Sequence, residues 1–323
     1  MTVQSPYEQW AHHLKATADP LRLVILRVLR QQSYGVLELS QILAIQQSRL
    51  SHHLKILTQA GLLAQRREGN SIFYQRHPAP DHWANTVFDT VDQWPLPDAI
   101  AAAQGAIATE RQAMAEAFFS RHAHQFKARQ DLIAEYPQYA EQARALLDEV
   151  PANRTHAVEV GPGMGEFLTL LQQRFQRVDA IDISREMLEK ARKTARAPAP
   201  DQTVQFFHGD LNGWQQTYTL QADVLIYNMV LHHIPTPEAE IARTADALAP
   251  GGYLLVTDLC RHEQSWARDN CGDQWLGFDR TDLNQWATRA GFTLQNSSVS
   301  ALRNGFQVQC LLWQKATPTA LQQ

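Results

Sequence analysis

The chain of 323 residues has few cysteines and no long apolar segment. Its 3 cysteines, Cys260, Cys271 and Cys310, are too few and too widely spaced for a disulfide framework or a paired-cysteine metal motif. No apolar run approaches the roughly 18 residues that a membrane-spanning helix needs, which excludes an integral membrane protein. Residues 1–15 lack the charged and then apolar pattern of a secretion signal, so we expect a cytoplasmic protein.

A strong net charge is also missing, because 29 Lys and Arg stand against 33 Asp and Glu. The length predicts two domains or one large one, and 44% apolar residues with 19% charged residues exclude a disordered chain. The near-neutral total conceals an asymmetry. Residues 1–80 hold 9 basic and 4 acidic side chains, a balance of +5, whereas residues 81–323 hold 20 and 29, a balance of -9. A basic N-terminal quarter on an acidic remainder suggests a nucleic-acid-binding module.

Residues 19–61 show the pattern of a helix-turn-helix. Asp19 is a favourable N-cap, Pro20 takes the first helical position, and apolar residues follow at helical spacing. A second helix is predicted over 36–43 and a third, polar helix over 46–60, with Gly61 as its stop. Six outward positions of the third helix carry side chains that bond to phosphates or base edges. They are Gln47, Ser48, Arg49, Ser51, His52 and Lys55.

A basic hairpin is predicted directly after the third helix. Residues 62–65 and 71–76 flank the turn sequence Glu68-Gly69-Asn70. Arg66, Arg67 and Arg76 make this hairpin cationic. Helix, turn, polar helix and basic hairpin in this order are typical of a winged helix, whose recognition helix enters the major groove while the wing touches the DNA backbone. We therefore predict DNA binding, with Arg66 and Arg67 as contacts from the wing.

This segment resembles the ArsR-type winged-helix repressors over roughly residues 15–77. The resemblance rests on the stretches ADPLR (18–22), QSRLSHHLK (47–55), AGLL (60–63) and RREGNSIFY (66–74). It implies a homodimer that binds a palindromic operator in double-stranded DNA. Many of these repressors sense a metal through a cysteine pair on the helix before the recognition helix. This chain has Glu38-Leu39-Ser40 there and no cysteine before Cys260, so metal sensing by that site is not expected.

Histidine pairs do not change this expectation. His12 and His13, His52 and His53, and His122 and His124 stand one or two residues apart, and such neighbours do not share a helix face. We therefore predict no metal site in the chain.

The middle of the chain is predicted to be helical. A short helix over residues 81–94 lies between prolines at 78 and 80 and prolines at 95 and 97. Its apolar side either pairs with a second copy of the chain or caps the winged helix. Two further helices are predicted, near 99–127 and 130–149. The domain boundaries we expect are a DNA-binding domain over 1–97, a helical linker and lid over 98–150, and a cofactor-binding domain over 151–323.

From residue 156 strands and helices alternate, which predicts an α/β domain with a doubly wound, Rossmann-like parallel sheet of seven strands. The strands are predicted at 157–160, 178–182, 204–208, 223–228, 253–258, 292–298 and 306–313. The helices are predicted at 165–174, 185–196, 238–248 and 281–290.

The first strand of this domain ends in the glycine-rich sequence VEVGPGMGE. Gly161, Gly163 and Gly165 allow the backbone to approach a ligand closely at a helix N-terminus. A dinucleotide fingerprint would place glycine at 166, where this chain has Glu166. Carboxylates follow at the next two strand ends, Asp182 for ribose recognition and Asp210 near an adenine edge.

This portion resembles the class I S-adenosylmethionine-dependent methyltransferases over about residues 115–315. The matching stretches are 159–165, 179–184, 209–211, 228–233 and 248–252. The resemblance implies that S-adenosylmethionine or S-adenosylhomocysteine is the cofactor. It also implies that residues 119–129 form a helical lid, although Lys127 replaces an acid often found there. The implied cofactor-binding residues are Glu159 with the three glycines at the methionine moiety, Asp182 at the ribose hydroxyls, Asp210 and Leu211 at the adenine, and Asn228 near the sulfonium. Ile183, next to Asp182, is also expected to bind the cofactor.

Methyl transfer from a sulfonium depends largely on positioning and needs at most one base. Tyr227, His232 and His233 are the candidate bases at the fourth strand end. For the two histidines, packing or bonding to the backbone at the start of a loop is the favoured interpretation. The insertion over 261–278 places Trp266, Trp275 and Phe278 either around an acceptor pocket or inside an ordinary loop. Cys260 and Cys271 lack a third cysteine nearby, which argues against an arsenite site.

Two functions remain open on the sequence alone. In the first, the chain is a transcriptional regulator whose second domain binds the cofactor and couples its level to operator binding, as the resemblance suggests. A ligand shifts DNA affinity only if it binds the two conformations differently. In the second, the domain is an active methyltransferase on an unidentified small molecule, and the winged helix is autoregulatory. The missing acceptor signature favours the regulator.

Overall fold

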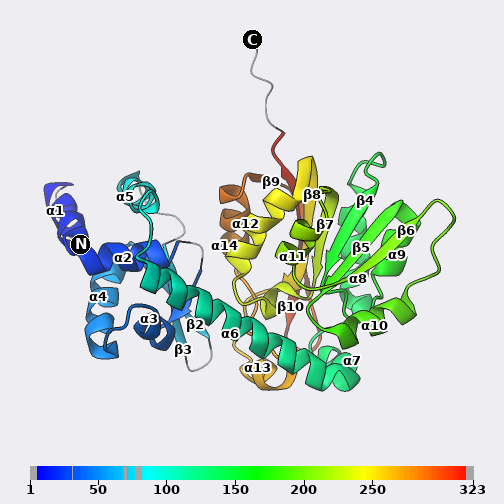
Figure 1. The fold of residues 1–323 in the computed structure, drawn as a ribbon, viewed down its shortest axis with the longest axis horizontal. Helices are drawn as coiled ribbons and strands as arrows, with labels where there is room; N and C mark the ends of the chain where they lie inside the picture. Colours follow the sequence, from blue (N-terminus) through cyan, green and yellow to red (C-terminus); the bar gives the residue numbers. More distant parts are fainter. Residues whose placement is uncertain (1–5, 31, 69–70, 78–81, 318–323) are drawn as a thin grey trace, which may run out of the picture. The chain divides into compact units, whose positions relative to one another are not determined.

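The computed structural model describes residues 6–30, 32–68, 71–77 and 82–317 (Figure 1). The chain forms two compact units, Met1–Arg111 and Gln112–Gln323. The division lies inside the long helix α6 (Asp98–His122), beyond the residue 97/98 boundary that the sequence suggested. Within the described residues no helix is both long and apolar enough to cross a membrane.

The first unit is a winged helix, as predicted, with a three-stranded antiparallel sheet in the order β1-β3-β2. The turn residues Gly69 and Asn70 of the wing lie outside the described residues. Helix α1 was not foreseen in the sequence. The elements before α6 are α1 (Pro6–Thr17), α2 (Pro20–Val28), β1 (Tyr34–Gly35), α3 (Val36–Ile42), α4 (Gln47–Gln59), β2 (Leu63–Glu68), β3 (Ser71–Arg76) and α5 (His82–Asp92).

Local signals in the sequence account for the recognition helix and its support. The Asp19 carboxylate accepts a hydrogen bond from the backbone N–H of Arg22 at 3.1 Å and so caps α2. Leu50, Leu54 and Leu57 are fully buried and fix α4 to the core of the unit. Gly61 follows α4 with a φ of +71°, the left-handed conformation that favours glycine at a helix end.

A buried arginine ties the wing to α5. Arg76, which is 6% exposed, donates hydrogen bonds to both carboxylate oxygens of Asp92 at 3.0 and 2.6 Å and to the carbonyl oxygen of Leu26 at 2.8 Å. Arg76 therefore uses its charge inside the unit and does not add to the cationic surface that the sequence suggested for the wing.

Replacing Asp92 by Asn is expected to destabilise the first unit by about 2–3 kcal/mol, because the buried Arg76 guanidinium then lacks its counter-charge. Denaturant unfolding of the full chain, followed by tryptophan fluorescence, measures this. Arg30→Gln is the matched control. Arg30 also pairs with Asp92, at 3.2 Å, but its side chain is 45% exposed, so we expect a loss below about 1 kcal/mol. Equal losses in the two variants would contradict the importance of the buried pair.

The second unit contains a seven-stranded sheet in the order β6-β5-β4-β7-β8-β10-β9, which confirms the predicted Rossmann-like fold. Neighbouring strands from β6 to β8 are parallel, whereas β10 runs antiparallel to both β8 and β9. The strands are β4 (His156–Val160), β5 (Arg177–Asp182), β6 (Thr203–His208), β7 (Ala222–Asn228), β8 (Leu248–Leu259), β9 (Phe292–Ala301) and β10 (Gln307–Lys315).

Helices cover this sheet, and three of them position the site (Figure 1). The end of α6, the short helix α7 (Phe126–Gln130) and α13 (Trp266–Cys271) carry residues of one pocket. Helices α11 and α13 were not predicted from the sequence. The other helices are η1 (Ala123–Gln125), α8 (Tyr136–Asp148), α9 (Leu168–Arg174), α10 (Arg185–Thr194), α11 (Leu211–Thr217), η2 (Leu231–His233), α12 (Pro237–Ala247) and α14 (Arg280–Arg289).

Parallel pairing brings the carboxyl ends of the central strands to one edge of the sheet. Val160 pairs with Ile181 and with Tyr227, so β4, β5 and β7 end side by side. Asp182 pairs with His208 at the end of β6. In open α/β sheets ligands bind beyond the carboxyl ends of the strands, so the predicted cofactor residues lie where a ligand is expected.

Candidate functional site

The loop after β4 has a backbone that only glycine adopts readily. Gly161, Gly163 and Gly165 have φ values of +66°, +56° and +78°. A Cβ on Gly161 would stand 2.3 Å from Cγ2 of Val230, and one on Gly165 would stand 2.7 Å from the Cα of Ala191. Helix α9 begins at Leu168, later than predicted, so the chain from 161 to 167 is a loop.

Glu159 is a buried carboxylate with an unused oxygen. Its side chain lies on β4, is 1% exposed, and accepts one hydrogen bond, from Asn228 Nδ2 to Oε1 at 3.2 Å. Oε2 of Glu159 and Oδ1 of Asn228 are buried without a hydrogen-bond partner. Burial raises the pKa of Glu159 to about 7. Two orphaned acceptor atoms side by side suit a ligand that brings hydrogen-bond donors.

Asp182 and Asp210 follow the next two strands. Oδ1 of Asp182 accepts the backbone N–H of Ser184 at 2.8 Å, and burial raises the pKa of this carboxyl to about 7. Asp210 caps α11 by accepting the backbone N–H of Gly213 at 2.8 Å, and the adjacent Leu211 is fully buried. Ile183 offers its carbonyl oxygen to the ring of His208 at 3.1 Å. The second carboxylate oxygen of Asp210, Oδ2, takes no part in this cap.

The lid predicted over residues 119–129 meets the glycine loop. A Cβ on Gly163 would stand 3.3 Å from the ring of Phe126, the first residue of α7. Lys127 forms an ion pair with Glu166 at 3.0 Å, and this hydrogen bond raises the pKa of Lys127. The lysine that replaces the expected acid therefore holds α7 against the glycine loop.

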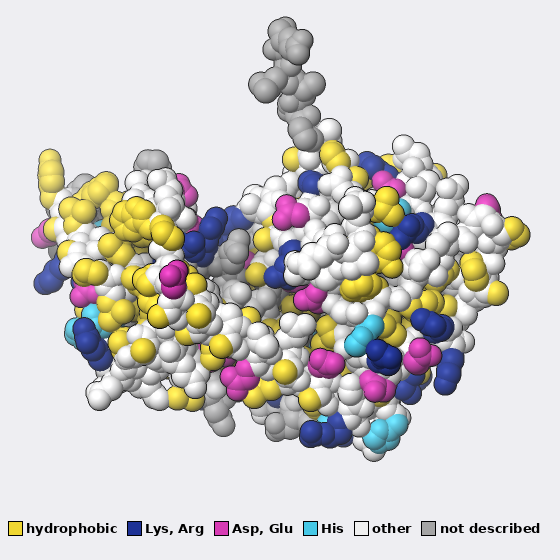
Figure 2. All heavy atoms as spheres, viewed as in Figure 1, with side chains coloured by type: hydrophobic (Ala, Val, Ile, Leu, Met, Phe, Trp, Pro, Cys, Tyr) yellow, Lys and Arg dark blue, Asp and Glu magenta, His cyan; other side chains and the backbone are white. Residues whose placement is uncertain are grey.

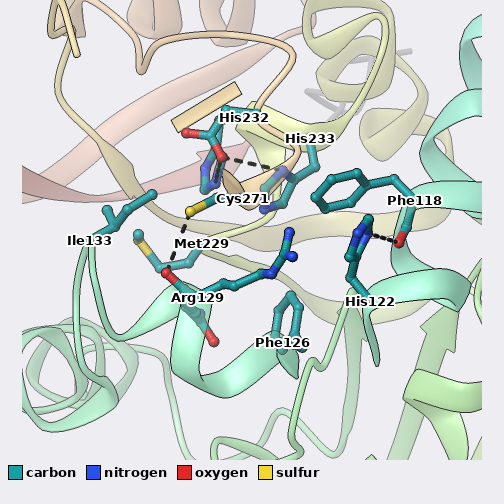
Figure 3. A pocket seen from close by; sticks show the side chains of 11 residues that line it. Phe118, His122, Phe126, Arg129, Ile133, Met229, His232, His233 and Cys271 are labelled. Carbon is teal, nitrogen blue, oxygen red and sulfur yellow. Dashed lines mark hydrogen bonds and ion pairs between the residues drawn. The ribbon is translucent and has the colours of Figure 1, made fainter. Parts of the chain in front are cut away.

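A pocket lies beside this lid and contains the two predicted histidines (Figure 3). Although burial lowers the pKa of His232, the carboxylates of Asp258 and Asp273 raise it to about 9. Nδ1 of His232 lies 2.7 Å from Oδ1 of Asp258. His232 therefore carries a proton at neutral pH and does not serve as a general base in this state. The pocket is lined by Phe118, His122, Phe126, Arg129, Gln130, Ile133, Met229, His232, His233, Cys271 and Asp273.

His233 has the opposite character. Burial and the neighbouring His232 lower its pKa well below the usual value, so its imidazole is neutral. Its Nδ1 lies 3.2 Å from the carbonyl oxygen of Gly272, which fixes the hydrogen on Nδ1 and leaves the lone pair on Nε2. The ring of Phe119 packs edge-on against the His233 ring, with the two ring centroids 4.9 Å apart. Of the candidate bases, His233 is the one able to accept a proton.

The structure does not place Tyr227 at the site. Its hydroxyl is fully buried against α12, where it donates to Oε1 of Glu240 at 2.9 Å and meets Thr244 at 3.1 Å. Burial raises the pKa of this hydroxyl well above its usual value. Tyr227 is therefore a core residue, and the prediction that named it as a base is wrong.

The tryptophans of the 261–278 insertion hold the loop rather than line the pocket. Trp275 is 3% exposed and donates from Nε1 to the carbonyl oxygen of Ile234 at 2.8 Å, and Trp266 packs against Phe306. The insertion contributes Asp273 instead, a residue that the sequence analysis missed. Both Asp273 carboxylate oxygens are buried without a hydrogen-bond partner.

The surface predicted to bind DNA is exposed on α4. Basic and histidine side chains lie together over this helix in Figure 2, and all six outward residues named from the sequence are exposed. Arg67 of the wing is exposed as well. Arg66 is only 4% exposed and pairs in register with Phe73, so the prediction that it contacts DNA is not supported by its position.

Models of known protein families match both parts of the chain. The family described as bacterial regulatory protein, arsR family, matches residues 19–65, and the family described as methyltransferase domain matches residues 122–297. The arsenic resistance transcriptional regulator ArsR1 of Pseudomonas putida is 34% identical over 95 residues, which cover 28% of this chain and 74% of that protein.

Methyltransferases are similar to the second unit. Trans-aconitate 2-methyltransferase of Paracidovorax citrulli is 37% identical over 117 residues, which cover 35% of this chain and 43% of that enzyme, less than half its length. A solved complex of the Trm112 methyltransferase activator with a methyltransferase from Haloferax volcanii matches with a TM-score of 0.51 and 15% identity. The structural match covers 63% of this chain and 98% of the matched chain. At this identity the structural likeness shows the fold alone.

Proposed function

The chain belongs to the methyltransferase-domain family and carries a helix-turn-helix of the arsR family, and from this premise we propose that it is a DNA-binding transcriptional regulator controlled by S-adenosylmethionine or S-adenosylhomocysteine. The observation that carries the proposal is the pair of half-satisfied carboxyls, the buried Glu159 and the half-buried Asp182, beside an intact glycine loop. The same chain presents a polar recognition helix.

The donor groups of the cofactor match the acceptors left at the site. Oε2 of Glu159 suits the α-ammonium of the methionine moiety, and the carboxylate of Asp182 suits two ribose hydroxyls. In this proposal Asp210 and Leu211 bound the adenine, with Ile183 beside the ribose, and Asn228 lies near the sulfonium. Bound S-adenosylmethionine supplies an electrophilic methyl group, whereas S-adenosylhomocysteine fills the same contacts without it.

The DNA-binding part of the proposal assigns Gln47, Ser48, Arg49, Ser51, His52 and Lys55 to the operator. Replacing Arg49 by Ala is expected to lower DNA affinity roughly 5- to 100-fold and to reduce the salt dependence by about one charge. Fluorescence anisotropy with a labelled duplex from upstream of the gene, at several salt concentrations, measures both.

The matched control for this experiment is Arg192→Ala, which removes an exposed arginine from α10 in the second unit. It should leave DNA affinity and salt slope unchanged. If the wild type does not bind upstream DNA at low salt, or if both variants lose DNA affinity equally, the assignment of α4 is contradicted.

A homodimer fits the surface of the first unit. Hydrophobic side chains gather over α1 and α5 in Figure 2, and Tyr7, Trp10 and Leu14 of α1 are 87%, 53% and 56% exposed. A patch of this kind marks an interaction surface more often than a solvated one. The stoichiometry of the same DNA titration checks it, since a dimer places two chains on one palindromic site.

The pocket supports a second candidate, methyl transfer to a small molecule. His233 offers a free Nε2, and Arg129 lines the same pocket beside the lid (Figure 3). A cationic group suits an acidic acceptor, and one relative is named for a carboxylic acid substrate. Release of S-adenosylhomocysteine in a screen of small acids would support this candidate. No turnover, together with an effect of the cofactor on DNA affinity, supports the regulator.

A further inference from the structure

Two histidines and one aspartate of the pocket converge on a single point. Nε2 of His232 and Nδ1 of His233, both from η2, lie 3.7 and 3.8 Å from Oδ1 of Asp273, which follows α13. All three residues are buried, and their ligand atoms lie within 4.8 Å of one another. Figure 3 shows the histidine side chains directed to the same corner of the pocket.

Asp273 is a buried carboxylate of this cluster whose oxygens have no hydrogen-bond donor among the described residues. Its side chain is fully buried, and neither carboxylate oxygen accepts a hydrogen bond. The other carboxylate nearby, Asp258, is satisfied, because it accepts from Nδ1 of His232 at 2.7 Å and from the backbone N–H of Leu259 at 2.7 Å. Burial of a carboxylate that accepts no hydrogen bond is costly, so the oxygens of Asp273 suit a bound cation.

We propose that His232, His233 and Asp273 bind a divalent transition-metal ion, with zinc as the reference ion. Two imidazoles and one carboxylate are a common protein donor set for zinc and for iron(II). Donors about 2.1 Å from such an ion stand roughly 3.4–3.6 Å apart. The two separations from Asp273, 3.7 and 3.8 Å, are close to this, while all three donor atoms lie within 4.8 Å of one another. His233 would turn from the carbonyl oxygen of Gly272 to complete the site. Binding of the ion through Nε2 displaces the proton of His232 from that nitrogen to solvent. The ion of charge +2 with two neutral imidazoles then balances the carboxylates of Asp258 and Asp273.

The surrounding contacts match those of a metal-bound histidine. Asp258 fixes His232 through Nδ1 and directs Nε2 at the proposed ion, the arrangement in which a carboxylate orients a metal ligand. When His233 binds the ion through Nδ1, its hydrogen moves to Nε2, so metal binding withdraws His233 as a proton acceptor. Three protein ligands leave a coordination position open to the pocket. This open position could hold an anionic oxygen of a methyl acceptor, a role that rests on the methyl-transfer function proposed above.

The test uses the full chain freed of metal with a chelator and then dialysed. Cobalt(II) followed by its visible absorption, and zinc followed by calorimetry, should each bind at one tight site per chain. Replacing Asp273 by Asn should weaken this binding by about 100-fold. Zinc should also raise the melting temperature of the wild type, and this rise should disappear in the variant.

Controls separate the site from folding and from the cofactor proposal. The metal-free Asp273→Asn variant should melt close to the wild type, because neither oxygen of Asp273 accepts a hydrogen bond that the substitution would remove. Cys271→Ser changes a pocket residue outside the cluster and should bind cobalt as the wild type does. Without metal, Asp273→Asn should bind S-adenosylhomocysteine as tightly as the wild type does. A failure of the metal proposal can therefore be told apart from a failure of the cofactor proposal. Absence of a cobalt spectrum, or tight binding that survives Asp273→Asn, would overturn the proposal.

Discussion

Replacing Glu159 by Gln is expected to weaken S-adenosylhomocysteine binding by at least about 100-fold and at the same time to stabilise the free protein. The affinity falls because the amide cannot form a charge-assisted bond with the ligand ammonium. Stability rises because the carboxyl, with its pKa raised by burial to about 7 from an ordinary value of 4.5, is ionised in a site that does not hydrate it.

The sign of the stability effect follows from that pKa. A carboxyl whose pKa is higher in the folded state destabilises the fold progressively as pH rises from about 4.5 to about 7, and fully above that. At 1.36 kcal/mol for each pKa unit, the penalty at pH 8 is about 3 kcal/mol. Gln keeps the acceptor for Asn228 and removes this penalty, so the gain should be near 3 kcal/mol at pH 8 and near zero at pH 4.

Calorimetry and denaturant unfolding at both pH values measure the two effects. Wild-type affinity should itself rise by about tenfold or more between pH 6 and pH 8, as Glu159 and Asp182 lose their protons. Glu141→Gln is the control, since this acid is exposed on α8 and lies outside the glycine loop and the lid. Unchanged ligand affinity in Glu159→Gln would remove Glu159 from the cofactor site.

Replacing Gly165 by Ala is expected to destabilise the second unit by about 3–5 kcal/mol. The φ of +78° costs an L-residue about 1–2 kcal/mol. The new methyl group would also stand 2.7 Å from both the Cα and the carbonyl oxygen of Ala191. These are backbone atoms of α10, so the clash is relieved only by moving the helix that follows β5.

A matched glycine keeps this prediction specific. Gly105 lies inside α6, and a Cβ added there would meet nothing within 4 Å, so Gly105→Ala should stabilise the chain by about 0.5–1 kcal/mol. Unfolding of both variants by denaturant, with and without S-adenosylhomocysteine, gives the comparison. A Gly165→Ala protein as stable as the wild type would show that the loop tolerates a side chain and would weaken its role in close ligand approach.

The elements that the sequence predicted well depend on local patterns. The Asp19 cap with Pro20, the leucine spacing of α4 and the glycines after β4 each determine their own backbone within a few residues. The seven-stranded sheet followed from alternating strands and helices, because a parallel sheet needs crossover connections. Strand ends then brought Glu159, Asp182 and Asn228 to one edge.

The residues that the sequence misplaced depend on partners far along the chain. Arg66 and Arg76 look alike in a basic hairpin, yet both are buried, and Arg76 is paired with Asp92 of a later helix. Tyr227 and Asn228 are neighbours at the same strand end. Only the packing of α12 shows that the tyrosine faces the core.

The same reason explains why the sequence did not predict that His232, His233 and Asp273 lie together. Asp273 is forty residues from His233 in an insertion without regular spacing, and no local pattern joins them. The prediction of no metal site came from adjacent histidine pairs, which do not share a helix face. In η2 the two rings instead lie with centroids 4.0 Å apart, and both reach Asp273.

The central claim is that one chain couples cofactor binding to DNA binding, and linkage makes this directly measurable. Calorimetry of S-adenosylhomocysteine binding to the free chain and to the chain saturated with upstream DNA gives the coupling in one experiment. We predict affinities that differ by about 5- to 150-fold, with DNA affinity changed by the same factor when the ligand is saturating. Equal S-adenosylhomocysteine affinities for the free and the DNA-bound chain would contradict the account.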